Sequence, residues 1–86
     1  MEKLVDAGCD VAMRAAVKVL RAAGKAETVD LDRFLPILRR ECKAAVDEGL
    51  SDSKAAVDAG MVEVARQTFL ASFATAGIRA AKEILA

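Results

Sequence analysis

The sequence contains no histidine, tryptophan, tyrosine or asparagine, and it has only one proline and one glutamine. Because histidine is missing, no serine or cysteine has its usual partner base, and the ordinary zinc sites and Glu-x-x-His metal sites are excluded. The five glycines are scattered singly, whereas phosphate-binding loops need clustered glycines before a helix. We therefore predict no catalytic, cofactor or metal site, and we expect the protein not to be an enzyme.

The chain also lacks an excess of either charge and any long apolar run. Its 13 Lys and Arg residues balance its 13 Asp and Glu residues, which argues against the strongly basic surface of a generic nucleic-acid-binding protein. The longest uncharged run, residues 67–78, falls well short of the ~20 residues that span a bilayer. Asp6 and Asp10 interrupt the only apolar stretch near the N-terminus that resembles a signal peptide. We expect a single cytoplasmic domain, residues 1–86, with no membrane segment.

Alanine is abundant, at 19 of the 86 residues, and it occurs in segments typical of helices. The first predicted helix covers residues 2–23, with Gly24 just past its end. The second begins after Asp30, whose side chain is expected to cap it, and Val29 and Phe34 are placed to form a hydrophobic staple. These signals predict two helices in the first half of the chain.

The second helix carries two residues that usually interrupt a helix. Pro36 lies too deep for a comfortable first turn, so we expect a kink there or a short turn before a helix that starts at Pro36. Gly49 is predicted to end the helix in a left-handed conformation, followed by Leu50 and then by Ser51 as the next N-cap. The third helix is therefore expected over residues 51–86.

Gly60 decides the length of that third helix. A glycine inside a helix costs about 1 kcal/mol relative to alanine, but Val57-Asp-Ala-Gly60 repeats Val5-Asp-Ala-Gly8, where the helical pattern continues through the glycine. A continuous helix would measure roughly 50 Å at ~1.5 Å per residue, more than the rest of the chain can flank. We therefore predict an all-α, three-helix, up-down-up chain whose bundle is completed by a homodimer; the alternative is a compact four-helix monomer broken at Gly60.

The apolar stripe of the third helix is the predicted dimer interface. Small residues such as Gly8, Gly60 and Gly77 are expected to let helix backbones approach closely. The first functional hypothesis is a small scaffolding or protein-interaction module, with a protein partner that the sequence does not name. The interface residues are Val62, Phe69, Phe73, Gly77 and Ile84.

A second hypothesis, a dimeric nucleic-acid-binding regulator, depends on basic residues of the second helix. These residues are expected on its outer face, where they would contact phosphates. Acidic neighbours dilute the patch, and no amide side chain is present there to read bases. The four basic residues are Arg33, Arg39, Arg40 and Lys43.

A third hypothesis, a thiol redox sensor, depends on the two cysteines. Cys9 and Cys42 lie 33 residues apart without a Cys-x-x-Cys motif. They are expected either as buried, small apolar residues in a reducing compartment or as a disulfide between the first two helices.

Overall fold

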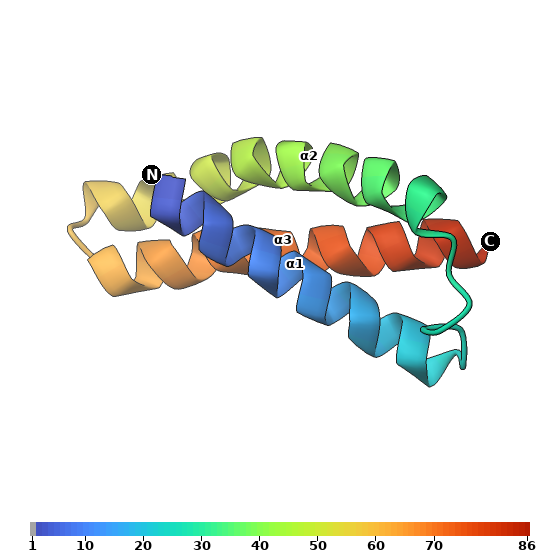
Figure 1. Ribbon diagram of the computed structural model, residues 1–86. Coiled ribbons are helices and arrows are strands. Elements are labelled where there is room, and N and C mark those ends of the chain that lie inside the picture. The colour runs from blue at the N-terminus through green and yellow to red at the C-terminus, as the bar shows by residue number, and fades with distance from the viewer. Residues whose placement is uncertain (1) are drawn as a thin grey trace.

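The computed structural model describes residues 2–86, and within that range the chain forms three α-helices and no strand. The helices are α1 (Glu2–Ala22), α2 (Leu31–Asp58) and α3 (Val62–Leu85). They run up, down and up in an elongated bundle of 45 × 21 × 21 Å (Figure 1). The predicted all-α, three-helix fold is therefore confirmed.

The boundary between the second and third helices differs from the prediction. Gly49 lies inside α2, which continues to Asp58, and the chain turns at Gly60 instead. Both the predicted turn at Gly49 and the continuous helix through Gly60 are wrong. The break at Gly60 that the alternative prediction contained is confirmed, but its fourth helix is not formed in residues 2–86, because residues 51–58 extend α2.

The contacts of the two glycines explain this difference. A Cβ atom at Gly49 would lie 2.7 Å from Ser72 Oγ and 3.1 Å from the Phe69 carbonyl oxygen, so Gly49 is a position of close helix approach. Gly60 has no atom within 4 Å of the corresponding position and has a φ of +74°, which favours glycine. The amide of Met61 donates to the Ala56 carbonyl at 2.8 Å across this turn, as in a glycine-terminated helix end.

The predicted start of α2 is confirmed. The Asp30 side chain accepts a hydrogen bond from the Asp32 amide at 3.0 Å, and Phe34 is buried with Val29 packed at the edge of the same core. Pro36 lies in the second turn, and the helix runs through it from Leu31 without a separate lead-in turn. In Figure 1, α2 follows a gentle arch over α3.

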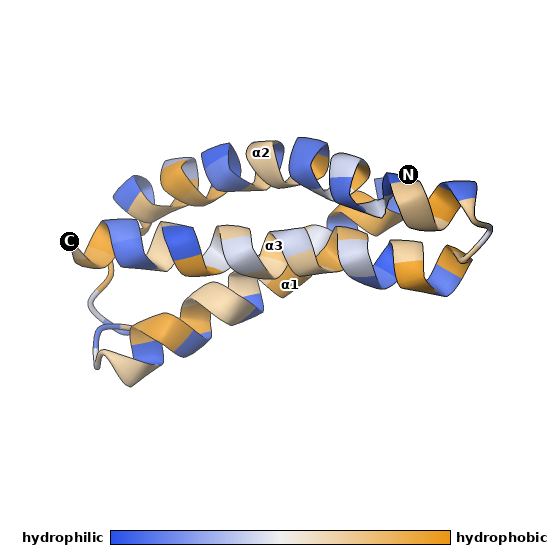
Figure 2. Cartoon of the chain, turned by 180° about the vertical axis from the view of Figure 1, so that it is seen from behind, coloured by the Kyte–Doolittle hydropathy of each residue, from blue (hydrophilic) through white to orange (hydrophobic). Residues whose placement is uncertain are grey.

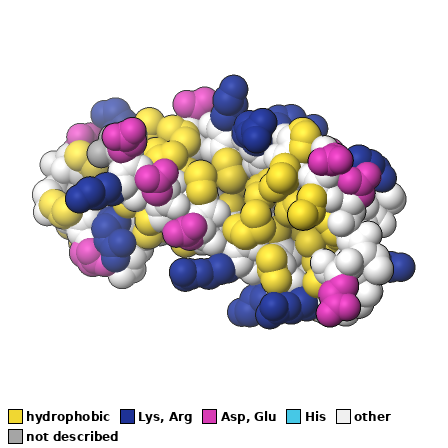
Figure 3. All heavy atoms as spheres, in the orientation of Figure 1, with side chains coloured by type: hydrophobic (Ala, Val, Ile, Leu, Met, Phe, Trp, Pro, Cys, Tyr) yellow, Lys and Arg dark blue, Asp and Glu magenta, His cyan; other side chains and the backbone are white. Residues whose placement is uncertain are grey.

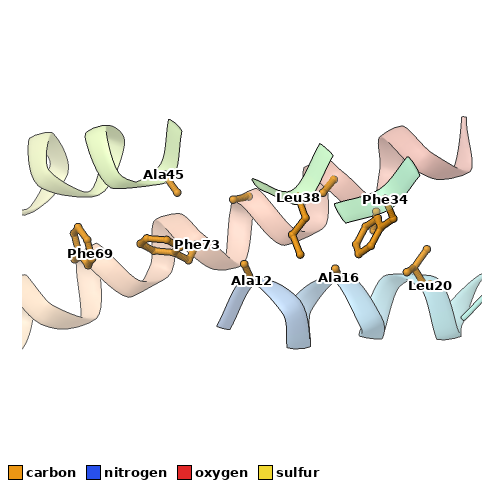
Figure 4. Packing of buried hydrophobic residues seen from close by; sticks show 11 residues of the cluster. Ala12, Ala16, Leu20, Phe34, Leu38, Ala45, Phe69 and Phe73 are labelled. Atoms are coloured by element: carbon orange, nitrogen blue, oxygen red, sulfur yellow. The ribbon is translucent and has the colours of Figure 1, made fainter. Parts of the chain in front are cut away.

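The core is formed where α1 and α2 each pack against α3, whereas α1 and α2 contact each other at only a few residues. A Cβ atom at Gly77 would lie 2.0 Å from the Ala12 carbonyl oxygen, and one at Gly8 would lie 2.6 Å from the Phe73 ring. The predicted close approach of helix backbones is therefore confirmed at Gly77 but not at Gly60, whereas Gly8 makes room for the Phe73 ring. Figure 4 shows Ala12 of α1 facing the core near Phe73 and Ala16 facing Leu38 and Phe34, and in the view of Figure 2 α3 lies between the other two helices.

Candidate interaction surface

The apolar stripe predicted as a dimer interface forms the core of the single chain. Phe69, Phe73 and Gly77 are buried by α1 and α2 of the same molecule. Only the two ends of the stripe keep exposed surface: Val62 is 76% exposed and Ile84 is half-buried. At 28 residues, α2 is longer than the 24-residue α3 and flanks it along its length. The third helix is therefore not too long for the rest of the chain to flank, which was the reason for predicting a second chain.

Large apolar side chains are nevertheless poorly covered in this molecule. The buried core consists of seven alanines and only five larger residues, whereas ten large apolar side chains are exposed among residues 2–86. Most folded monomers bury their large aliphatic residues preferentially. This protein therefore leaves many of its large apolar side chains uncovered, and Figure 3 shows hydrophobic side chains gathered over the space between α1 and α2.

One line of these residues follows the side of α2 that faces α1, and we call it the α2 stripe. Its members recur at spacings of four and seven residues, which place them on one face of a helix. α1 comes close to α2 beside the middle of this line, where two members are half-buried, and leaves both ends exposed. The α2 stripe consists of Leu31, Leu35, Cys42, Val46, Leu50 and Val57.

The larger exposed area lies at the α2–α3 turn. Leu50 and Val57 of α2 line one hollow together with Val62, which follows the exposed Met61, and the exposed fractions of the four side chains lie between 45% for Leu50 and 76% for Val62. We call these four residues the turn patch. A hollow of about 410 Å³ opens beside them, with Leu4 and Phe69 among its apolar lining residues.

The charge on this hollow is already neutralised. Arg66, its only charged lining residue, has its guanidinium 3.0 Å from the Glu63 carboxylate. The hydrogen bond with Arg66 is also the main reason why the pKa of Glu63 is lowered. Because this pair is internal to α3, the hollow beside the turn patch has no unpaired charge among its lining residues in the range 2–86.

A second, smaller hollow lies at the opposite end of the α2 stripe, below the connection between α1 and α2. It has a volume of about 330 Å³. Its floor is the buried pair Leu20 and Phe34, and its rim includes Met13 and Leu31. The two ends of the α2 stripe therefore open onto separate hollows.

The four basic residues of α2 are exposed, but they do not form an uninterrupted patch. The Arg40 guanidinium pairs with Glu83 of α3 and lies 3.3 Å from Glu41. The hydrogen bond with Glu83 is the largest cause of the raised pKa of Arg40. The remaining three, Arg33, Arg39 and Lys43, keep exposed side chains on α2.

The two cysteines are free, and they lie across the contact between α1 and α2. Cys9 is exposed, so the expectation of two buried cysteines is wrong for this residue, whereas Cys42 is half-buried against the core. Burial, and then the nearby Cys9 thiol, raise the pKa of Cys42 from its ordinary value of 9.0 to about 11. Both thiols are free, and Cys9 lies near enough to Cys42 to contribute to this shift.

No family model, curated protein or solved structure matches this chain. In the described residues, no three His, Cys, Asp or Glu side chains come together in a group that would hold a metal ion. None of the three helices within residues 2–85 is long and apolar enough to cross a bilayer.

The sequence predicted Val62 as an interface residue but did not single out Leu50, Val57 or Met61. Leu50 and Val57 line the same hollow as Val62 only because the chain turns at Gly60. The pattern that pointed to them was the continued helical spacing of Leu50, Ser53 and Val57 beyond Gly49.

Proposed function

We propose that this protein is a small homodimeric interaction module, and that two copies bind each other through the turn patch. The observation that carries the proposal is the clustering of four exposed apolar residues, Leu50, Val57, Met61 and Val62, beside an apolar hollow. Exposed clusters of this kind mark sites of association on proteins. A dimer presents every remaining surface twice about a two-fold axis, which suits a scaffolding role.

A second copy is the occupant that the shape and charge of the patch favour. The patch combines an apolar turn, formed by Met61 and Val62, with a hollow beside it. In a dimer with a two-fold axis, the turn of each copy can therefore pack into the hollow of the other. The Arg66–Glu63 pair leaves no charge to be matched by a partner. A self-complementary apolar contact is therefore favoured over a charged peptide or nucleic acid.

The test compares two substitutions at equivalent positions. Val62 is the first residue of α3 and Leu31 is the first residue of α2, and both are exposed. Glutamate near a helix N-terminus is compatible with the helix dipole, so Val62→Glu and Leu31→Glu are both expected to fold. Only Val62→Glu places a charge in the turn patch.

The expected result is a dimer for the wild type and for Leu31→Glu, and a monomer for Val62→Glu. Mass is measured by light scattering with refractive-index detection, because the chain has no Trp or Tyr to absorb at 280 nm. A wild type that remains a 9.1 kDa monomer would refute the dimer. Equal masses for the two variants would refute the location of the interface.

A further inference from the structure

Cys9 and Cys42 lie at the same level along the bundle, as the packing of each helix against α3 shows. On α1, Gly8 packs against Phe73 and Ala12 against Gly77. Cys9 follows Gly8, so it lies level with the turn of α3 between Phe73 and Gly77. α1 and α3 run in the same direction, which makes this alignment hold over the adjacent turns.

The register of α2 brings Cys42 to that same turn. The Ser72 hydroxyl donates to the Ala45 carbonyl at 2.9 Å, and Gly49 lies against Phe69. Because α2 runs antiparallel to α3, moving back from Ala45 to Cys42 corresponds to moving forward along α3 beyond Ser72. Both cysteines therefore lie level with the same turn of the central helix, Cys9 on α1 and Cys42 on α2.

The side chains also face one another. Cys42 belongs to the α2 stripe, which faces α1, and it is close enough to the Cys9 thiol to interact with it. Cys9 is exposed and therefore accessible to a dissolved oxidant, whereas Cys42 is half-buried beside it. This arrangement places a thiol that can react with peroxide next to a second thiol that can resolve the sulfenic acid into a disulfide.

We propose that Cys9 and Cys42 form a reversible intramolecular disulfide that joins α1 to α2 where these helices meet, with a peroxide as the oxidant. This inference does not rest on dimerisation through the turn patch.

The reaction with hydrogen peroxide balances in two steps. The Cys9 thiolate attacks one peroxide oxygen, the O–O bond breaks, and Cys9 sulfenic acid and hydroxide form. The Cys42 thiolate then attacks the Cys9 sulfur, so that the S–S bond forms, the S–O bond breaks and a second hydroxide leaves. The protons lost by the two thiols convert both hydroxides to water. The two thiols lose two electrons, which reduce one peroxide molecule.

The environment of Cys42 makes the second step slow at neutral pH. Only a thiolate attacks, and the raised pKa of Cys42 keeps most of this thiol protonated. Cys9 from α1 and Glu41 from α2 both disfavour the thiolate, and Phe73 and Gly77 at this level of α3 carry no charge. Disulfide formation is therefore expected to accelerate as the pH rises from 7 to 9.

The test treats the reduced, full-length protein with hydrogen peroxide at low protein concentration. The expected product is a single chain that has lost two hydrogen atoms in intact mass and contains a Cys9–Cys42 crosslink in peptide mapping. The native protein should close this bond at least about tenfold faster than the same protein unfolded in urea, because the fold raises the effective concentration of one thiol at the other. A thiol reductant should restore the original mass.

Two sets of variants keep the test decisive. Cys9→Ser and Cys42→Ser should each abolish the two-hydrogen loss, while Val62→Glu should still form the crosslink even as a monomer. A disulfide between two chains, oxidation of Cys9 only to sulfinic acid, or equal closure rates in buffer and urea would each overturn the proposal. Since the Val62→Glu measurement does not require a dimer, failure of the disulfide is distinguishable from failure of the proposed function.

Discussion

The inner face of α3 and the α2 stripe are both apolar, but neighbouring helices cover them to different extents. The α3 face combines small residues with Phe69 and Phe73, and both neighbouring helices cover it completely. The α2 stripe carries large aliphatic residues, yet α1 covers only its middle. The comparison shows that close backbone approach draws α1 and α2 onto α3 at the expense of contact with each other. The uncovered ends of the α2 stripe are the consequence.

Disrupting the close approach of α1 to α3 is expected to give the largest loss of stability. In Gly77→Ala the new methyl group would overlap the Ala12 carbonyl oxygen, which is backbone and cannot rotate away. We expect the free energy of unfolding to fall by about 3 kcal/mol or more, because overpacking displaces the helix itself. Urea unfolding followed by circular dichroism measures this loss. Thr75→Ala, at an exposed position of α3, should change stability by less than about 0.5 kcal/mol; equal effects would contradict the account.

A smaller loss is expected from the one buried hydroxyl that joins α2 to α3. Ser72 Oγ lies 2.9 Å from the Ala45 carbonyl and 2.6 Å from the Phe69 carbonyl. Ser72→Ala removes this hydrogen bond without leaving an unpaired donor, so we expect a loss of about 1 kcal/mol. The same unfolding assay applies. An unchanged stability would mean that backbone packing alone joins the two helices here.

The middle of the α2 stripe predicts a pH dependence. The fold raises the pKa of Cys42 from 9.0 to about 11, so it favours the protonated thiol. The resulting stabilisation is fully present below pH 9 and is lost as the pH rises toward 11. Under reducing conditions, the wild type should therefore lose more stability between pH 8.5 and 10.5 than Cys42→Ala does, in paired urea titrations. Identical pH profiles would place Cys42 in solvent.

The exposed ion pair at the edge of the α2–α3 contact is expected to contribute least to stability. Arg40 pairs with Glu83, but both side chains are substantially exposed. Exposed pairs of this kind contribute little to stability, so Arg40→Ala should lower stability clearly less than Ser72→Ala does. The residual effect should shrink further in molar salt. A loss as large as that of Ser72→Ala would show that the edge, not the buried face, holds α2 to α3.

The sequence was sufficient to predict the helical class, the number of helices, the Asp30 cap and the close approach of helix backbones at Gly77. It was not sufficient to place the second turn. Lys43-Ala-Ala-Val-Asp-Glu-Gly49 and Lys54-Ala-Ala-Val-Asp-Ala-Gly60 are nearly the same segment, so local signals cannot distinguish the two glycines. Contacts with α3 distinguish them, because Gly49 faces Phe69 and Gly60 faces open space.

The position of that turn also determined how much of the candidate surface was predictable. Val62 was predicted as part of a continuous stripe with Phe69 and Phe73, whereas in the fold it belongs with Leu50, Val57 and Met61. The sequence predicted a disulfide between Cys9 and Cys42 in a helical hairpin as one of two alternatives, the other being two buried thiols. Their common level depends on the register of each helix against α3, which no local pattern specifies.

The most direct test of the central claim, that the turn patch is covered by a second copy, is the mass of the wild-type chain as a function of concentration. Light scattering across a micromolar to millimolar range should give twice the 9.1 kDa chain mass at the upper end, with dissociation only on dilution. A mass that stays at 9.1 kDa throughout would contradict the claim.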